Sequence, residues 1–191
     1  MSGAAEPSER QTYPDEAAGS ALPVTIRLMT PGDLDAVWEL EKRCFPTPWS
    51  REMLERHALY NPSTRYYVAE LQWGIVGYIG IYLAADEGHI VTLAVSERHR
   101  RRKIGSQLLI AALMAAREGG AKTVVLEYRV SNRVAERMYA KFGFEPIAVR
   151  PNYYRDTGED AIMMVLRGLD TVTFLNRIEN IRSSWAARGT A

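Results

Sequence analysis

The stretch that decides the fold runs from His89 to Leu109 and reads HIVTLAVSERHRRRKIGSQLL. An apolar run, His89–Val95, precedes five basic residues within the six positions of Arg98–Lys103, and an apolar helical pattern follows Gly105. This change of period predicts a strand that passes through a basic loop into a helix. Such a loop has three interpretations: it binds nucleic acid, forms a solvated edge, or holds a phosphorylated cofactor.

After this loop, the pattern predicts a helix, a buried strand, a second helix and two closing strands. The first helix has one apolar face and ends at Gly119-Gly120. The segment KTVVLEY, Lys122–Tyr128, is nearly all apolar, as expected of a central parallel strand that is covered on both faces. Ser131 or Asn132 caps the second helix, and Gly143 ends it. The closing strands are expected near residues 146–150 and 161–166.

Before the loop, alternation at residues 24–29 predicts a first strand. A helix that begins at Thr30 follows, and Glu41 is the one polar member of its apolar face. A short helix through residues 50–57 and a hairpin of strands 65–71 and 75–84 complete this half. The expected element order is βααβββαβαββ, with one right-handed β-α-β crossover at its centre.

The ends of the chain differ from its middle in composition. Residues 1–22 are rich in Ala, Ser, Glu and Pro and are expected to form a disordered tail. Residues 23–167 are expected to form one domain, and residues 168–191 an extension with a weak amphipathic helix.

Bulk composition excludes several classes of function. The net charge is only +1, whereas a protein that binds nucleic acid in bulk is usually basic over a whole face. Cys44 is the only cysteine and the three histidines lack ligand spacing, so no disulfide framework and no metal site are expected. No apolar run approaches ~18 residues and no secretion signal is seen, so a cytoplasmic protein is expected.

Four segments of the chain resemble the acetyl-CoA core of the GNAT family of N-acetyltransferases: VTLAV, RRRKIG, LEYRVSN and AERMYAKFGF. CFPTPWS and NYYRDTGEDAIMM resemble, more narrowly, the bacterial ribosomal-protein-alanine N-acetyltransferases of the RimI type. The resemblance covers residues 24–167. It implies an α/β (α+β) fold with a mixed, mostly antiparallel sheet, a central parallel β-α-β crossover, and helices on both faces.

The resemblance also implies that acetyl-CoA is the cosubstrate and that the basic loop holds its pyrophosphate. The family loop, Arg/Gln-x-x-Gly-x-Gly/Ala, maps onto Arg100–Gly105, with Lys103 at the first glycine position. At negative φ a lysine there costs little, and its ammonium can reach a phosphate of coenzyme A. The implied contacts are Leu93, Ala94, Val95, Arg101, Arg102, Lys103, Ile104, Gly105, Ser106 and Asn132.

Two residues match the catalytic positions of the family. Glu127, a carboxylate at the end of an apolar central strand, matches the general base, and Tyr139 matches the general acid. The residues alone leave alternatives open. An ion pair with Arg129 or Arg133 would also account for Glu127, and Tyr139 lies on the apolar face of its helix, where core packing would explain it.

The sequence constrains the acceptor less than the cosubstrate. By resemblance it is the N-terminus of a protein, the alanine of ribosomal protein S18, with Trp49, Tyr153 and Tyr154 either lining a peptide groove or packing. A small amine or a lysine side chain is the first alternative, and a silent acetyl-CoA-binding regulatory module is the second. Direct nucleic-acid binding is disfavoured because the basic loop lacks interleaved aromatic residues. No membrane partner is expected, and the chain is expected to be a monomer or a weak dimer.

Overall fold

The computed structural model describes residues 24–186, so the expected N-terminal tail lies outside the described residues. The strands are β1 (Thr25–Leu28), β2 (Thr64–Leu71), β3 (Gly74–Ala84), β4 (Glu87–Val95), β5 (Thr123–Arg129), β6 (Glu145–Tyr154) and β7 (Glu159–Arg167). The α-helices are α1 (Leu34–Cys44), α2 (Arg51–Glu55), α3 (Ile104–Glu118), α4 (Arg133–Phe142) and α5 (Val172–Ala186). Three short helical segments, η1 (Pro31–Asp33), η2 (Arg56–Tyr60) and η3 (Glu97–His99), lie between them.

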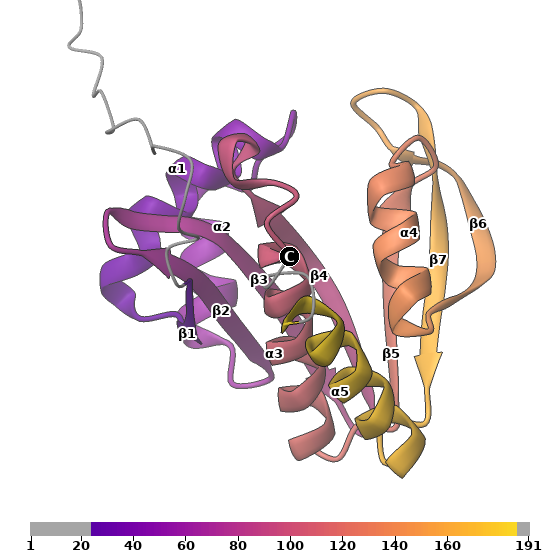
Figure 1. The fold of residues 1–191 in the computed structure, drawn as a ribbon. Coiled ribbons are helices and arrows are strands. Elements are labelled where there is room, and N and C mark those ends of the chain that lie inside the picture. Colours follow the sequence, from indigo (N-terminus) through magenta and orange to yellow (C-terminus); the bar gives the residue numbers. More distant parts are fainter. Residues whose placement is uncertain (1–23, 187–191) are drawn as a thin grey trace, which may run out of the picture.

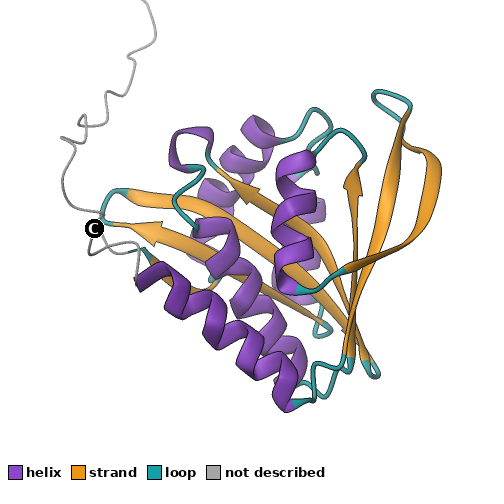
Figure 2. Ribbon diagram, turned by 45° about the vertical axis from the view of Figure 1, so that its right-hand side comes forward, coloured by secondary structure: helices purple, strands orange, loops and turns teal. Residues whose placement is uncertain are grey.

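The strands form one sheet (Figure 2), and their order in it is β1-β2-β3-β4-β5-β7-β6. Only β4 and β5 pair in parallel, through α3, and the other neighbours are antiparallel. Two buried clusters cover the two faces: α3, α4 and α5 contribute to one, and α1 and α2 to the other. The mixed, mostly antiparallel sheet with a central parallel crossover and helices on both faces is therefore confirmed.

The centre of the sheet opens where β4 and β5 separate. Their pairing extends only from Glu87 opposite Thr123 to Ile90 opposite Leu126. Beyond that point both strands continue without pairing to each other, and Figure 1 shows them diverging. The result is a V-shaped opening whose apex lies at Ile90 and Leu126.

One strand is longer than the sequence predicts. The strand expected near 146–150 extends over Glu145–Tyr154, with irregular pairing to β7. All of its residues except Tyr154 are exposed, so the strand has no alternation of buried and exposed residues from which its length could be predicted. The C-terminal extension contains α5, whose Phe174, Ile178 and Ile181 are buried in the main core. None of the helices within residues 24–186 has the length and apolar character needed to cross a membrane.

Candidate active site

The basic loop leads into the N-terminus of α3, beside the opening. Arg101 and Lys103 have φ angles of 63° and 66°, in the left-handed region that non-glycine residues rarely adopt. Lys103 is the N-cap of α3, and its side chain makes no capping hydrogen bond. The first backbone N–H groups of a helix have no intrahelical partner and carry the positive end of the helix dipole. This loop therefore has the backbone features that favour anion binding.

Lys103 differs from the sequence expectation in both backbone and side chain. Lysine would cost little stability at a negative φ, but the φ of Lys103 is positive. For a residue with a Cβ, this conformation costs about 1 kcal/mol. The side chain of Lys103 contacts α5, because its Nζ lies 3.4 Å from the carbonyl oxygen of Trp185. The ammonium is also 5.9 Å from the centre of the Trp185 indole ring.

The edge of β4 supplies the next part of the site. Ser96 N–H donates to the Val76 carbonyl, which fixes the phase of the antiparallel ladder between β3 and β4. Because hydrogen-bonded pairs alternate along such a ladder, Ala94 directs its backbone groups to β3, and Leu93 and Val95 direct theirs into the opening. Of the three β4 residues expected to contact acetyl-CoA (Leu93, Ala94 and Val95), Leu93 and Val95 are thus the ones whose N–H groups are available to polarise the thioester carbonyl.

Glu127 is the first residue of β5 beyond the apex of the opening. Its side chain is only 5% exposed, and its Oε2 lies 2.6 Å from His89 Nε2. His89 is opposite Val125, two residues before Glu127, so both side chains are on the same face of the sheet. Arg150 Nη1 lies 3.1 Å from Oε1, at ion-pair distance but without hydrogen-bond geometry. Oε1 is therefore buried, without a hydrogen-bond partner within residues 24–186, and Arg150 is its ion-pair partner.

The charge state of Glu127 follows from these neighbours. The hydrogen bond from His89 is the largest influence and lowers the pKa of the carboxyl below its usual value, burial opposes this, and the charges of His89 and Arg150 add to the lowering. Glu127 is accordingly a carboxylate at neutral pH and can accept a proton.

The alternative prediction, that Glu127 forms an ion pair with Arg129 or Arg133, is wrong. Arg129 pairs with Asp156 at 2.7 Å and with Glu159 at 3.5 Å, which ties the end of β5 to the β6–β7 hairpin. Arg133 pairs with Glu136 on α4 at 2.9 Å. Both partners of Glu127 come from other strands, so neither could be found among its sequence neighbours.

Tyr139 lies on α4, and Asn132 is the N-cap of this helix, which stands on the other side of the opening from α3 (Figure 1). The Tyr139 ring is buried, with ring centres 6.0 Å from Tyr128 and 5.7 Å from Phe144. Burial raises the pKa of its phenol, so the group carries its proton at neutral pH, as a general acid must. Asn132 Oδ1 accepts a hydrogen bond from Ala135 N–H and so caps α4.

Glu41 is the polar residue on the apolar face of α1, and its hydrogen-bond partners explain why it is there. Its side chain is buried, accepts a hydrogen bond from the Tyr78 hydroxyl, and accepts another from Trp49 N–H at 3.0 Å. The second bond fixes the α1–α2 loop, which carries Trp49. Trp49 in turn packs edge-on against His57, with ring centres 5.0 Å apart.

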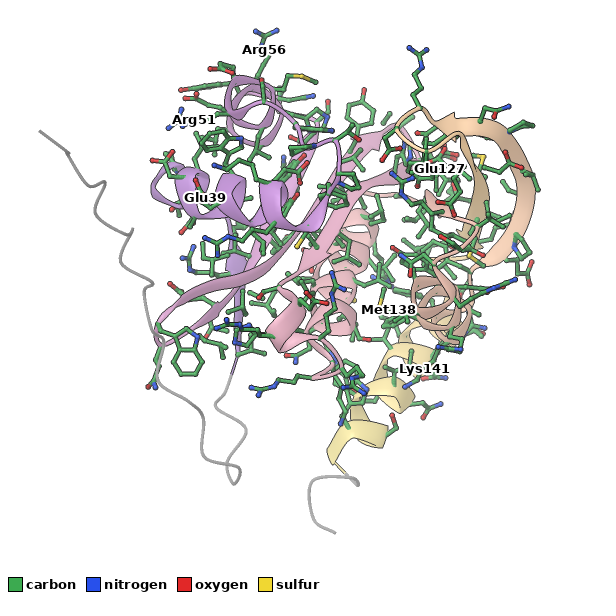
Figure 3. All side chains as sticks on the ribbon, turned by 90° about the horizontal axis from the view of Figure 1, so that it is seen from above. Glu39, Arg51, Arg56, Glu127, Met138 and Lys141 are labelled. Atoms are coloured by element: carbon green, nitrogen blue, oxygen red, sulfur yellow. The ribbon has the colours of Figure 1, made fainter. Side chains whose placement is uncertain are left out.

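Two segments are expected to bind the acceptor: the α1–α2 loop, which carries Trp49, and the part of β6 that carries Tyr153 and Tyr154. They lie on opposite sides of the opening. Viewed from above, Glu127 lies by the β6–β7 hairpin, and Glu39 and Arg51, on α1 and α2, lie across from it (Figure 3). Tyr153 and Tyr154 of β6 are adjacent, with ring centres 5.1 Å apart, and Arg129 stacks 3.9 Å above the Tyr154 ring. Within residues 24–186, no group of three or more His, Cys, Asp or Glu side chains is placed to bind a metal ion.

Comparison with known proteins agrees with this arrangement. The sequence profile of the acetyltransferase (GNAT) family matches residues 34–144, from the start of α1 to the end of the Gly143 turn. The chain belongs to the GNAT family. It is therefore an acetyltransferase that depends on acetyl-CoA, and a nucleic-acid-binding function is not needed to explain the basic loop.

Individual relatives are similar over most of their length. The [ribosomal protein bS18]-alanine N-acetyltransferase of Escherichia coli K12 is 33% identical over 146 residues, which is 74% of this chain and 96% of that protein. An N-alpha-acetyltransferase of Sulfurisphaera tokodaii is 34% identical over 145 residues, 69% of this chain and 86% of that protein. The crystal structure of the E. coli S18-alanine enzyme superposes with a TM-score of 0.70 at 27% identity, covering 76% of this chain and 94% of that one.

The residues of the opening fit acetyl-CoA. The N-terminus of α3 offers backbone N–H groups to a pyrophosphate, and the edge of β4 offers the N–H groups of Leu93 and Val95 to an extended amide chain. The Val95 carbonyl oxygen already accepts a hydrogen bond from Arg100 Nε at 3.3 Å. When bound there, acetyl-CoA supplies an activated thioester. Glu127 is the first β5 residue beyond the last β4–β5 pair, so an acyl group bound at the apex of the opening would lie near the carboxylate.

Replacement of Tyr139 by phenylalanine tests the general acid. The Tyr139→Phe variant is expected to lower kcat by about 10²-fold, since it removes only the proton given to the leaving thiolate. The defect should persist at high pH and shrink with an acyl donor whose thiol is more acidic. Steady-state rates on both donors measure this, and a full rate with the ordinary donor would leave Tyr139 as a core residue only. Tyr128→Phe is the matched control, because Tyr128 packs on the same ring.

Proposed function

We propose that this protein transfers the acetyl group of acetyl-CoA to the N-terminal α-amino group of a protein, and that its acceptor is the N-terminal alanine of ribosomal protein S18. The observation that carries the proposal is Glu127: a buried carboxylate, held by His89 at the apex of the β4–β5 opening, with one oxygen lacking a hydrogen-bond partner in the described part of the chain. The similarity to S18-alanine enzymes supports the choice of acceptor. A ribosomal acceptor implies that the enzyme works in the cytoplasm.

The chemistry is a direct transfer. The neutral amine nitrogen forms a bond to the acetyl carbonyl carbon, and the N–H groups of Leu93 and Val95 stabilise the negative charge that develops on the carbonyl oxygen. Glu127 accepts the proton that the nitrogen loses, directly or through one water. The carbon–sulfur bond then breaks, and Tyr139 donates its proton to the departing thiolate.

The weak basicity of Glu127 favours an α-amino acceptor over a lysine. The pKa of an α-amino group is about 7.7–8.0 and that of lysine about 10.4, so the neutral fraction at pH 7 is a few hundredfold larger for the α-amino group. A carboxylate whose pKa is lowered is a poor base for a fully protonated lysine. Most of the neutral amine that attacks acetyl-CoA is therefore present because the α-amino group has a low pKa, and not because Glu127 removes a proton from it.

A panel of peptides that differ only in their first residue tests this proposal. Peptides that begin with alanine are expected to be acetylated with the highest kcat/KM, at least about tenfold above those that begin with a large residue. A peptide with a blocked N-terminus and a free lysine should react a few hundredfold more slowly at pH 7. Mass spectrometry of the products assigns the modified nitrogen.

Two outcomes would contradict the acceptor. Preferential acetylation of the blocked lysine peptide would show that the acceptor is a lysine side chain. Preferential acetylation of a small free amine over every peptide would show that the acceptor is a small molecule. Equal rates on all unblocked peptides would retain N-terminal acetylation, in line with the N-alpha-acetyltransferase relative, and would remove the preference for alanine.

A further inference from the structure

The contact between Lys103 and α5 has no place in the chemistry described above. Lys103 occupies a left-handed conformation at the N-cap of α3, in the loop that faces the pyrophosphate. Its ammonium donates to the Trp185 carbonyl at 3.4 Å and lies 5.9 Å from the centre of the indole ring. The two residues are separated by 82 positions in the chain, so this contact depends entirely on the placement of α5.

Trp185 is held firmly enough to act as a fixed support. Phe174, Ile178 and Ile181 anchor α5 in the main core, and Trp185 packs partly buried against the same core. In the N-terminal half of α5, Arg177 Nη1 donates to the Phe142 carbonyl at 3.3 Å, which joins α5 to the end of α4. α5 thus contacts both helices that border the opening.

We propose that Trp185 is a positioning residue for acetyl-CoA: it holds Lys103 in the left-handed conformation that the cofactor loop requires. The family loop has glycine here, which adopts positive φ without steric cost. This chain has lysine, and α5, which lies beyond the family match at residues 34–144, supplies the contact that a glycine does not need. The inference concerns the cosubstrate and holds whichever amine is acetylated.

The geometry makes the role specific to the side chain of Lys103. A cation close to an aromatic face and to a carbonyl at a helix C-terminus is attracted to both. These two contacts restrain the side chain of Lys103, and with it the left-handed backbone conformation at the N-cap of α3. The loop is thereby preorganised before acetyl-CoA binds.

A double-mutant cycle on the full chain tests the proposal, with the dissociation constant of acetyl-CoA measured by calorimetry. Trp185→Ala is expected to weaken binding about fivefold, the size of a lost cation–aromatic contact. In a Lys103→Gly background the same substitution should change the constant less than about twofold, because glycine does not need the support. Trp185→Phe, which keeps an aromatic face, should retain most of the wild-type affinity.

Trp38→Ala is the matched control, since Lys42 Nζ lies 3.8 Å from the Trp38 ring in a similar pair on α1, and acetyl-CoA affinity should not change. An equal loss of affinity from Trp185→Ala in both backgrounds would overturn the proposal, because it would show that Trp185 acts through general packing of α5. Unchanged affinity in both backgrounds would overturn it as well. If the acceptor assignment fails in the peptide panel, this cycle is unaffected, because it measures binding of acetyl-CoA alone.

Discussion

Glu127→Gln is expected to lower kcat by 10²–10⁴-fold at neutral pH, the usual contribution of a general base. Glutamine keeps the shape of the side chain and can still contact His89, but it cannot accept the proton of the amine. Affinity for acetyl-CoA should barely change, because Glu127 faces away from the α3 loop and towards His89 and Arg150. Steady-state kinetics and calorimetry on the same variant separate the two effects.

The pH dependence of this defect has a definite sign. As pH rises towards the pKa of the α-amino group, more hydroxide is present to accept the proton that the attacking nitrogen loses, so the base matters less and the ratio of wild-type to variant rates should shrink. Glu127 itself has a lowered pKa, and hence stays ionised throughout this range. By linkage, its ionised form stabilises the fold above the ordinary carboxyl pKa, and this contribution is lost as pH falls through the lowered value.

Glu70→Gln serves as the control, because Glu70 is also paired with an arginine, Arg27, but on β2 and far from the opening. Its kcat should be close to that of the wild type. Full activity of Glu127→Gln at neutral pH would make Glu127 a structural partner of His89 and Arg150, and the base would have to be sought elsewhere.

The sequence was sufficient to predict the fold because the chain has strong local signals in its central half. The change of period across His89–Leu109, the apolar strand at Lys122–Tyr128 and the Gly143 stop each depend on neighbours within a few residues. The structure has the central crossover that these signals predict. The polar position at Glu41 was also visible, although its partners, Tyr78 and Trp49, were not.

The parts that were missed depend on contacts between distant residues. His89 reads as one polar residue in an apolar strand, and only the parallel register of β4 and β5 brings it to Glu127. Arg150 reaches the same carboxylate because β7 places Met163 between Glu127 and Ala148, two residues before Arg150. The φ of Lys103 could not be predicted either, since the residue that contacts its side chain is Trp185 in α5. In each case the decisive neighbour is set by tertiary structure.

Gly105→Val is expected to abolish most of the binding of acetyl-CoA while leaving the fold intact. A Cβ at Gly105 would lie 3.6 Å from Met138 Sδ and 3.7 Å from Val95 Cγ2, ordinary contact distances, so the free protein can accommodate it. The additional methyl groups of valine would occupy the space at the start of α3 where a pyrophosphate must approach the backbone closely. Affinity should fall by at least about 100-fold.

Ligand-induced stabilisation measures this loss directly. For the wild type, acetyl-CoA at 100 times its dissociation constant should stabilise the fold by about 2.7 kcal/mol, and at the same concentration the Gly105→Val variant should gain almost nothing. Ala115→Val is the matched control, since it also adds a β-branched side chain to α3 but lies more than two turns from the loop. Its thermal shift should equal that of the wild type. An undiminished shift in Gly105→Val would mean that the pyrophosphate does not approach the start of α3, and would exclude the basic loop as the cofactor site.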